Sequence, residues 1–252
     1  MSLSVDVITL APEMWQAMDS GVIGRAKANG IWQQHLWLLR DFSHRKDRRV
    51  DDHSYGGGPG MVLAPQPLQA CIKHIQQQRK KKPLVIQMDP AGTPFDAVMA
   101  SRLAQSSSIA IICGRYEGID HRITETYVDE LISMGPYVVS GGDLPAMCLV
   151  DAVIRHLPGA LGNADSAAED SYAQGLLDTP HYTRPAEHPL GEVPKVLTSG
   201  NHADITKWRR MMALGRTWVY QPQLLQGQTL TATDIELLNT FIRAYNTDHG
   251  ER

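Results

Sequence analysis

The stretch Ile109-Ala110-Ile111-Ile112-Cys113-Gly114-Arg115-Tyr116-Glu117-Gly118 decides the fold class, because a wholly apolar run passes directly into a turn bounded by glycines. Short apolar runs rich in β-branched residues are typical of strands that are buried on both faces of a parallel sheet. Residues 5–10 and 84–88 repeat this pattern, and helical patterns at 65–79 and 96–105 separate the runs. The alternation predicts an α/β domain with a parallel sheet.

The rest of the chain predicts the end of this domain and a second, smaller unit. A helix is expected from Asp143, as its N-cap, to residue 156, with Pro145 in the first turn. Residues 159–174 lose the apolar periodicity, so we interpret them as a mobile linker. Helices are expected again at 205–214 and 233–245, the second opened by a capping box of Thr233 and Glu236. The C-terminal part is therefore predicted to be mainly helical.

Three turns contain the residues that a ligand pocket needs. They are Asp89-Pro90-Ala91-Gly92, the turn from Gly114 to Gly118, and the segment from Gly135 to Gly142. In open α/β sheets, ligands bind beyond the carboxyl ends of the strands, and glycine allows a positive φ or a close approach of the backbone. We therefore expect a ligand pocket where these turns converge. The alternative for each turn taken alone is an ordinary tight turn.

Composition excludes several classes of protein. The net charge of −3 and the apolar fraction of the 252 residues are ordinary for a globular chain. No G-x-G-x-x-G, P-loop or G-x-S-x-G motif occurs, which disfavours a dinucleotide site, a nucleotide phosphate loop and a hydrolase elbow. Cys71, Cys113 and Cys148 are far apart, so we expect reduced core residues rather than disulfides or zinc ligands. With no leader pattern and no membrane-length apolar run, a cytoplasmic location is expected.

Clusters of basic residues and of glycines in the sequence support the hypothesis that the chain binds a polyanion. Basic residues gather at 40–49 and 79–82, and they belong either to a solvated surface or to a polyanion site. The glycine-rich segment from Tyr55 to Met61 could pass beside a planar base or a phosphate, or be a plain flexible loop. The acidic candidates for proton transfer are Glu117, Asp151, Glu169 and Asp170.

Five blocks of sequence, in order along nearly the whole chain, carry a family resemblance. They are Gly56-Gly57-Gly58-Pro59-Gly60-Met61, Cys113-Gly114-Arg115-Tyr116-Glu117-Gly118-Ile119-Asp120, Ser140-Gly141-Gly142-Asp143-Leu144-Pro145-Ala146, Gly175-Leu176-Leu177-Asp178-Thr179-Pro180-His181-Tyr182-Thr183-Arg184-Pro185 and Leu197-Thr198-Ser199-Gly200-Asn201-His202. With these blocks the chain resembles the bacterial tRNA (guanine-N1)-methyltransferases.

The resemblance implies a fold, a reaction and partners. The fold is a SPOUT-type α/β domain with a deep trefoil knot at residues 1–160, a flexible linker at 161–174 and a helical tRNA-binding domain at 175–252. The reaction is methyl transfer from S-adenosylmethionine to N1 of guanine 37, next to the anticodon, in tRNAs with a guanine before it. The implied partners are tRNA and a second copy of the chain, with active sites at the subunit interface. The resemblance also hints at Mg²⁺, although no cluster of metal ligands is identified in the sequence.

The resemblance also assigns roles to single residues. Asp170 matches the general base and Arg155 the arginine that works with it. Gly57, Gly58, Arg184 and Arg209 are expected to contact RNA, and Lys207, Arg210 and Arg216 are further candidates for phosphate contacts. The residues expected to hold the methyl donor are Met88, Pro90, Gly114, Tyr116, Glu117, Met134, Gly135, Pro136, Tyr137, Val138, Val139, Gly141, Gly142 and Pro145.

Three positions depart from the family pattern. Met134 and Pro136 stand where the family more often has Ile and Asp, and Gln87 replaces a frequent tyrosine. Proline lacks the backbone N–H and the carboxylate, so a contact made at residue 136 is in question. Two alternatives stay open: a knotted RNA-binding module without catalysis, and a small-molecule enzyme of ordinary α/β type that uses the same pocket.

Overall fold

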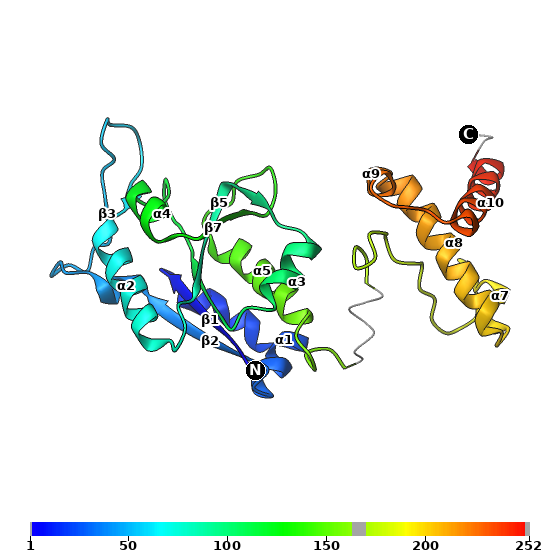
Figure 1. Ribbon diagram of the computed structural model, residues 1–252, viewed down its shortest axis with the longest axis horizontal. Coiled ribbons are helices and arrows are strands. Elements are labelled where there is room, and N and C mark those ends of the chain that lie inside the picture. The colour runs from blue at the N-terminus through cyan, green and yellow to red at the C-terminus, as the bar shows by residue number, and fades with distance from the viewer. Residues whose placement is uncertain (1, 163–169, 250–252) are drawn as a thin grey trace. The chain divides into compact units, whose positions relative to one another are not determined.

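The computed structural model describes residues 2–162 and 170–249 (Figure 1). The chain divides into two compact units, Met1–Ala164 and Asp165–Arg252. The first unit holds the sheet, and the second is built mainly of helices. None of the helices in the described ranges is long and apolar enough to cross a membrane.

The first unit is organised around a five-stranded sheet in the order β2-β1-β6-β5-β7, with every neighbouring pair parallel. The predicted α/β fold with a parallel sheet is thus confirmed. The threading that a trefoil knot requires stays a prediction. The strands are β1 (Leu3–Thr9), β2 (Trp32–Leu38), β5 (Leu84–Pro94), β6 (Ser108–Ile112) and β7 (Glu130–Ser133).

Helices cover both faces of the sheet, which explains why the central strands are apolar throughout. On β6, Ile109 and Ile111 belong to one buried cluster, and Ala110 and Ile112 belong to the other. The first cluster lies under α1 (Gly21–Ala28), α3 (Ala97–Leu103), α5 (Asp143–Arg155) and the 3-10 helix η1 (Pro12–Asp19). The second lies under α2 (Pro65–Gln78), α4 (His121–Tyr127) and the 3-10 helix η2 (Leu39–Phe42) (Figure 1).

Strand β5 continues beyond the predicted end at residue 88. Its pairing with β7 shifts between Met88 and Thr93, so the residues between them bulge out of the ladder. Gly92 lies so close to β7 that a Cβ there would be 2.4 Å from the backbone nitrogen of Ile132. The bulge therefore leaves the Asp89-Pro90-Ala91-Gly92 turn out of the ladder without ending the strand.

The second unit packs its helices around a small core of Leu176, Leu214 and Leu237. Gly215 allows close packing of the two long helices, because a Cβ there would lie 2.2 Å from Cγ of Phe241. A short hairpin, β8 (Glu187–His188) with β9 (Gly191–Glu192), precedes the helices. A second short hairpin, β3 (Asp51–Asp52) with β4 (Val62–Leu63), belongs to the first unit. The helices of the second unit are α7 (Lys195–Thr198), α8 (His202–Tyr220), α9 (Gln223–Gln226) and α10 (Ala232–His249).

Three sequence-based predictions about local structure are wrong. Gly142, not Asp143, is the N-cap of α5, and the Asp143 side chain turns into the core. The capping box of α10 is two residues earlier than predicted, where Thr231 and Asp234 exchange hydrogen bonds. Cys148 is exposed on α5, whereas Cys71 and Cys113 are buried as expected.

The middle of the interval predicted as a linker falls outside the described residues. Residues 163–169, which include the candidate acid Glu169, lie there. After them, the chain forms turns from residue 170 to 176, with the backbone N–H of Tyr172 donating to the carbonyl of Leu176 at 2.7 Å.

Candidate functional site

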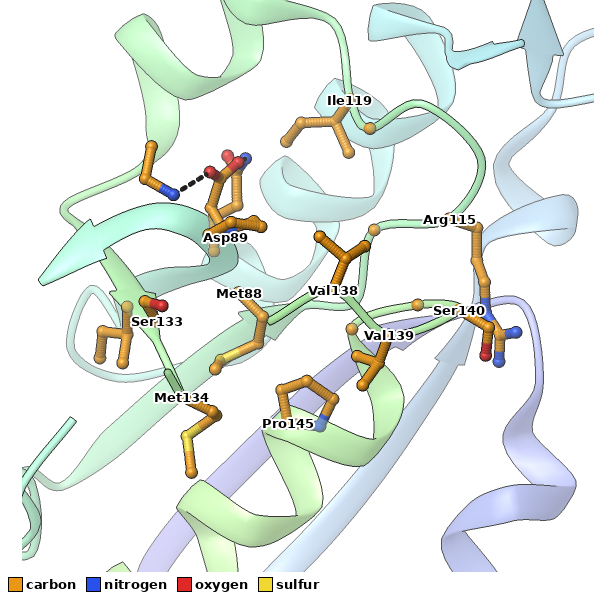
Figure 2. Close-up of a pocket in the computed structure, with 18 of the residues that line it drawn as sticks. Met88, Asp89, Arg115, Ile119, Ser133, Met134, Val138, Val139, Ser140 and Pro145 are labelled. Carbon is orange, nitrogen blue, oxygen red and sulfur yellow. Dashed lines mark hydrogen bonds between the residues drawn. The ribbon is translucent and has the colours of Figure 1, made fainter. Parts of the chain in front are cut away.

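A cavity of about 440 Å³ lies at the carboxyl edge of the sheet, where the three glycine-bearing turns meet. Its volume falls within the range of pockets that bind small ligands. In Figure 2, the apolar side chains of Met88, Val138, Val139 and Pro145 surround its centre. All of the residues predicted to hold the methyl donor line this cavity, except Pro136; they are Met88, Pro90, Gly114, Tyr116, Glu117, Met134, Gly135, Tyr137, Val138, Val139, Gly141, Gly142 and Pro145.

Glycines allow two of these turns to press against each other. The backbone N–H of Gly142 donates to the carbonyl of Gly114 at 2.8 Å. A Cβ on Gly142 would lie 2.8 Å from Cα of Cys113, so no larger residue fits there without a backbone shift. A Cβ on Gly141 would likewise lie 2.6 Å from Cδ of Arg115. The walls of the cavity are therefore fixed by backbone contact rather than by side chains alone.

Asp143 lies next to this cavity and holds its wall in place through hydrogen bonds, a role that the sequence did not reveal. Its carboxylate is fully buried and accepts hydrogen bonds from Thr9 Oγ1 at 2.5 Å and Trp15 Nε1 at 3.0 Å. The guanidinium of Arg115 donates to Asp143 Oδ2 through Nε at 3.1 Å and through a terminal nitrogen at 2.7 Å. This network joins the end of β1, the turn after β6 and the start of α5.

The side chain of Arg115 points away from the apolar centre of the cavity (Figure 2). The arginine therefore holds the turn in place.

Burial and the nearby charge of Asp143 raise the pKa of the Cys113 thiol well above its usual range. This agrees with the prediction that Cys113 is a core residue, since its thiol is buried.

Gln87 takes part in a second polar network at the cavity wall. Its amide nitrogen donates to Asp89 Oδ2 at 2.8 Å, and its amide oxygen accepts from Thr124 Oγ1 at 2.8 Å. Asp89 also accepts from the backbone N–H of Ala91 at 2.9 Å. The glutamine that departs from the family pattern therefore fixes the Asp89 turn against α4. Of the other two departures, Met134 lines the cavity, whereas Pro136 is exposed and does not line it.

The glycine-rich segment between β3 and β4 is hydrogen-bonded to the turn from Gly114 to Gly118, which follows β6. The backbone N–H of Glu117 donates to the carbonyl of Met61, and that of Leu63 donates to the carbonyl of Gly118, both at 3.0 Å. Gly57 and Gly58, predicted to contact RNA, have positive φ angles and open space where a Cβ would stand. They are glycines because of the backbone conformation and not because of close neighbours.

The two residues predicted to carry catalysis belong to different units. Arg155 is the last residue of α5, in the first unit. Asp170 belongs to the second unit and lines a cavity of about 310 Å³ together with Arg209 and Asp178. Burial acts to raise the pKa of Asp178, but hydrogen bonds from His181 and Thr179 outweigh it and lower that pKa.

Many of the basic residues considered as phosphate contacts are paired with acids. Arg48 pairs with Asp41 in one such contact, and Arg79 is held by the buried carboxylate of Asp6. In the second unit, Arg209 is exposed on α8, and Arg184 is exposed in the segment before β8. Further pairs are Arg45–Asp52, Arg49–Asp51, Lys82–Asp129 and Arg210–Asp234. The sequence clusters at 40–49 and 79–82 therefore present less free positive charge than their composition indicates.

Within residues 2–162 and 170–249, no group of three or more His, Cys, Asp or Glu side chains is arranged to hold a metal ion. His181 lies against Asp178, with Nε2 at 2.8 Å from a carboxylate oxygen.

Comparison with known proteins identifies the family. The model of the family described as tRNA (Guanine-1)-methyltransferase TrmD matches residues 3–227. The chain belongs to this family. The TrmD match covers the cavity and all three of its glycine-bearing turns, as well as Arg155, Asp170 and Arg209.

Curated relatives agree over nearly the full length. A protein of Sodalis glossinidius named tRNA (guanine-N(1)-)-methyltransferase is 50% identical over 242 residues, which are 96% of this chain and 96% of the relative. Proteins of the same name from Klebsiella pneumoniae and Escherichia coli K12 are each 47% identical over 249 residues, 98% of this chain and 96% of theirs. The TrmD family is a family of methyltransferases, so the resemblance seen in the sequence blocks is confirmed.

Proposed function

We propose that this protein transfers a methyl group from S-adenosylmethionine to N1 of guanine 37 in tRNA. The observation that carries the proposal is the cavity at the sheet edge of a TrmD-family chain, lined by nearly all the residues that the family resemblance assigns to the methyl donor. In this proposal residues 1–160 bind the methyl donor and residues 175–252 bind tRNA. Residues 161–174 form the linker between these two parts. A cytoplasmic location, where tRNA is found, belongs to the same proposal.

The residues of the cavity fit a methyl donor of this kind. Met88, Val138 and Pro145 give an apolar wall for a flat, uncharged purine, and the glycine turns supply backbone groups at close range. The carboxylates of Asp89 and Glu117 also line the cavity and suit a positively charged ligand. When bound, S-adenosylmethionine supplies a methyl group on a positively charged sulfur.

The acceptor must be activated, because N1 of guanine carries a proton. We assign the removal of this proton to the carboxylate of Asp170, a step that typically contributes about 10²–10⁴-fold to the rate. The guanidinium of Arg155 would stabilise the negative charge that develops toward O6 of the guanine. Holding the reacting atoms in line within about 3–3.5 Å is the remaining task of the protein.

Exposed apolar side chains at the cavity support the proposal of a homodimer. Tyr116, Tyr137, Val138 and Val139 line the cavity and are exposed, and Leu144 is exposed on the adjoining turn of α5. Such a concentration of exposed apolar side chains is typical of a surface that another protein covers. We therefore propose that a second copy completes the active site. The family resemblance also hints at a requirement for Mg²⁺, which titration with EDTA tests.

A transfer assay tests the proposal. Wild-type protein is incubated with radiolabelled S-adenosylmethionine and two tRNA transcripts, one with guanines at positions 36 and 37 and one with adenine at 37. Label is expected only in the first transcript. Binding of the transcript without transfer would support an inactive RNA-binding module instead. Binding of S-adenosylmethionine with neither RNA binding nor transfer would point to a small-molecule enzyme.

A further inference from the structure

Tyr55 is the most exposed large apolar side chain among the residues that the structure describes, with a relative exposure of 101%. It stands in the loop between β3 and β4, immediately before the glycine-rich segment. Figure 1 shows this loop extending beyond the body of the first unit, beside α4. Burial of an aromatic ring is favourable because it lowers the free energy. A fully exposed tyrosine at such a place therefore indicates a surface that a partner covers.

The loop leaves the ring accessible. Gly56, Gly57 and Gly58 follow it with positive φ angles, and no atom lies within 4 Å of the position where their Cβ atoms would be. Ser54 Oγ donates to the carbonyl of Gly57 at 3.0 Å, which closes the loop on itself. The absence of side chains at the three glycines leaves room for a flat group beside Tyr55.

The base of the loop is attached to the candidate active site. Gly60 lies against Glu117, because a Cβ on Gly60 would be 2.5 Å from Cγ of that residue. Glu117 lines the cavity, and its backbone N–H is bonded to the carbonyl of Met61. The position of Tyr55 is thus linked by a few residues to the wall of the methyl-donor cavity.

The neighbourhood of Tyr55 suits a nucleic acid. The ring of Tyr55 is fully exposed, so both of its faces can take a stacking partner. Unpaired bases in RNA loops are commonly recognised by stacking on tyrosine or other aromatic rings. Such stacking tolerates any base, because every base has a π face. It would therefore position an RNA without reading its sequence.

We propose that Tyr55 stacks on an unpaired base of the tRNA anticodon loop, next to the guanine that is methylated. This inference rests on the proposed function and adds to it a residue that positions the RNA. In this arrangement the ring stabilises one neighbouring base and so favours the turned-out conformation in which the guanine reaches the cavity. Tyr55 touches neither the methyl donor nor the reacting nitrogen, so it is a positioning residue.

The experiment measures tRNA binding by Tyr55→Ala, Tyr55→Phe and Tyr55→Leu in the presence of S-adenosylhomocysteine. Tyr55→Ala and Tyr55→Leu are expected to weaken binding about 5-fold to 150-fold, the range for loss of one base stack. Tyr55→Phe keeps the π face and is expected to bind like wild type. Val98→Ala, which trims another well-exposed side chain of the first unit, is the matched control. The affinity for S-adenosylhomocysteine without RNA should be the same in all five proteins.

A cycle with modified RNA identifies the base. Transcripts with an abasic nucleotide at position 36 or at position 38 are bound to wild type and to Tyr55→Ala. The loss caused by Tyr55→Ala is expected to shrink with one of these RNAs, because the stacking partner is already absent. An unchanged loss with both RNAs, or no loss with intact tRNA, would overturn the inference. A shift of Tyr55→Ala to monomer in sedimentation would also overturn it, in favour of a contact between subunits.

Failure of the inference and failure of the proposed function give different results. If the wild-type protein transfers no methyl group to the transcript, the proposed function fails whatever Tyr55 does. If wild type transfers the methyl group and Tyr55→Ala binds and turns over tRNA as wild type does, only the inference about Tyr55 fails.

Discussion

Asp143 shows how one residue can fix a site without facing it. Its carboxylate is 0% exposed and receives hydrogen bonds from Thr9, Trp15 and Arg115, which come from separate parts of the chain. A buried ion pair contributes little net stability, but removal of one partner leaves the other buried charge uncompensated. The geometry of the cavity wall therefore depends on the carboxylate of this one residue.

Asp143→Asn is predicted to destabilise the first unit by about 3–5 kcal/mol, because the amide leaves the guanidinium of Arg115 without its negative partner. Urea unfolding followed by circular dichroism measures the change. Asp151→Asn, an exposed position on the same helix, is the control and should stay within about 0.5 kcal/mol of wild type. Equal stability of the two variants would contradict the role given to Asp143.

Asp170→Ala is predicted to lower the turnover of tRNA by about 10²–10⁴-fold, because the proton on N1 of guanine would have no positioned base. Its affinity for S-adenosylmethionine, measured by calorimetry, should change little. Glu192→Ala removes an exposed carboxylate of the same unit and serves as the control. A large loss of methyl-donor affinity in Asp170→Ala would argue against its assignment as the base.

At the scale of elements, the pattern of apolar residues predicted the strands that are buried on both faces. It missed a partly polar edge strand and a very short strand. The runs at 84–88 and 109–113 predicted β5 and β6, because strands covered on both faces must be apolar throughout. Strand β2 was not predicted, since Trp32-Gln33-Gln34-His35-Leu36-Trp37-Leu38 is half polar, as suits an edge strand. β7 was missed because it has only four residues.

The candidate site divides in the same way. Glycine turns after apolar runs predicted where the cavity lies, because ligands bind at the carboxyl ends of parallel strands. The Asp143–Arg115 pair could not be predicted, since its partners Thr9 and Trp15 are more than a hundred positions away from Asp143 in the chain. The donor role of single residues came from family resemblance and not from these patterns.

Gly215→Ala is predicted to destabilise the second unit. Alanine favours the helix by about 0.8–1 kcal/mol over glycine, but its Cβ would overlap the ring of Phe241, and overpacking typically costs about 1–3 kcal/mol. Because the overlap is severe, the clash is expected to win, and thermal unfolding should occur at a lower temperature. Gly227→Ala has no neighbour within 4 Å and provides the control. A more stable Gly215→Ala would show that α8 and α10 can move apart freely.

The start of α10 gives a prediction about pH. Hydrogen bonds from Arg210, followed by those from Thr231, lower the pKa of Asp234 well below its usual range, against the effect of burial. A lowered pKa in the folded state stabilises the protein above the unfolded pKa of about 3.9, and this stabilisation is lost as the pH falls further. Wild type should therefore exceed Asp234→Asn in melting temperature near neutral pH, and the difference should shrink below about pH 4. A difference that is independent of pH would contradict this explanation.

For the whole molecule, the proposal requires a second copy at the exposed apolar surface of the cavity. Leu144→Asp is predicted to shift the protein toward monomer in sedimentation equilibrium, because a charge would be buried in an apolar interface. Val98→Asp places the same charge at an exposed position of α3 and should not change the mass. Methyl transfer should fall with the loss of the dimer. A monomeric wild-type protein with full activity would refute the shared active site.

The central claim is methylation of N1 of guanine 37, and identification of the product nucleoside tests it most directly. A tRNA transcript with guanines at 36 and 37 is incubated with the protein and S-adenosylmethionine, digested to nucleosides and analysed by mass spectrometry. Our account predicts 1-methylguanosine, located at position 37 by primer extension and lost when that guanine is replaced. Absence of a methylated nucleoside, or methylation at another atom or another guanine, would contradict the account.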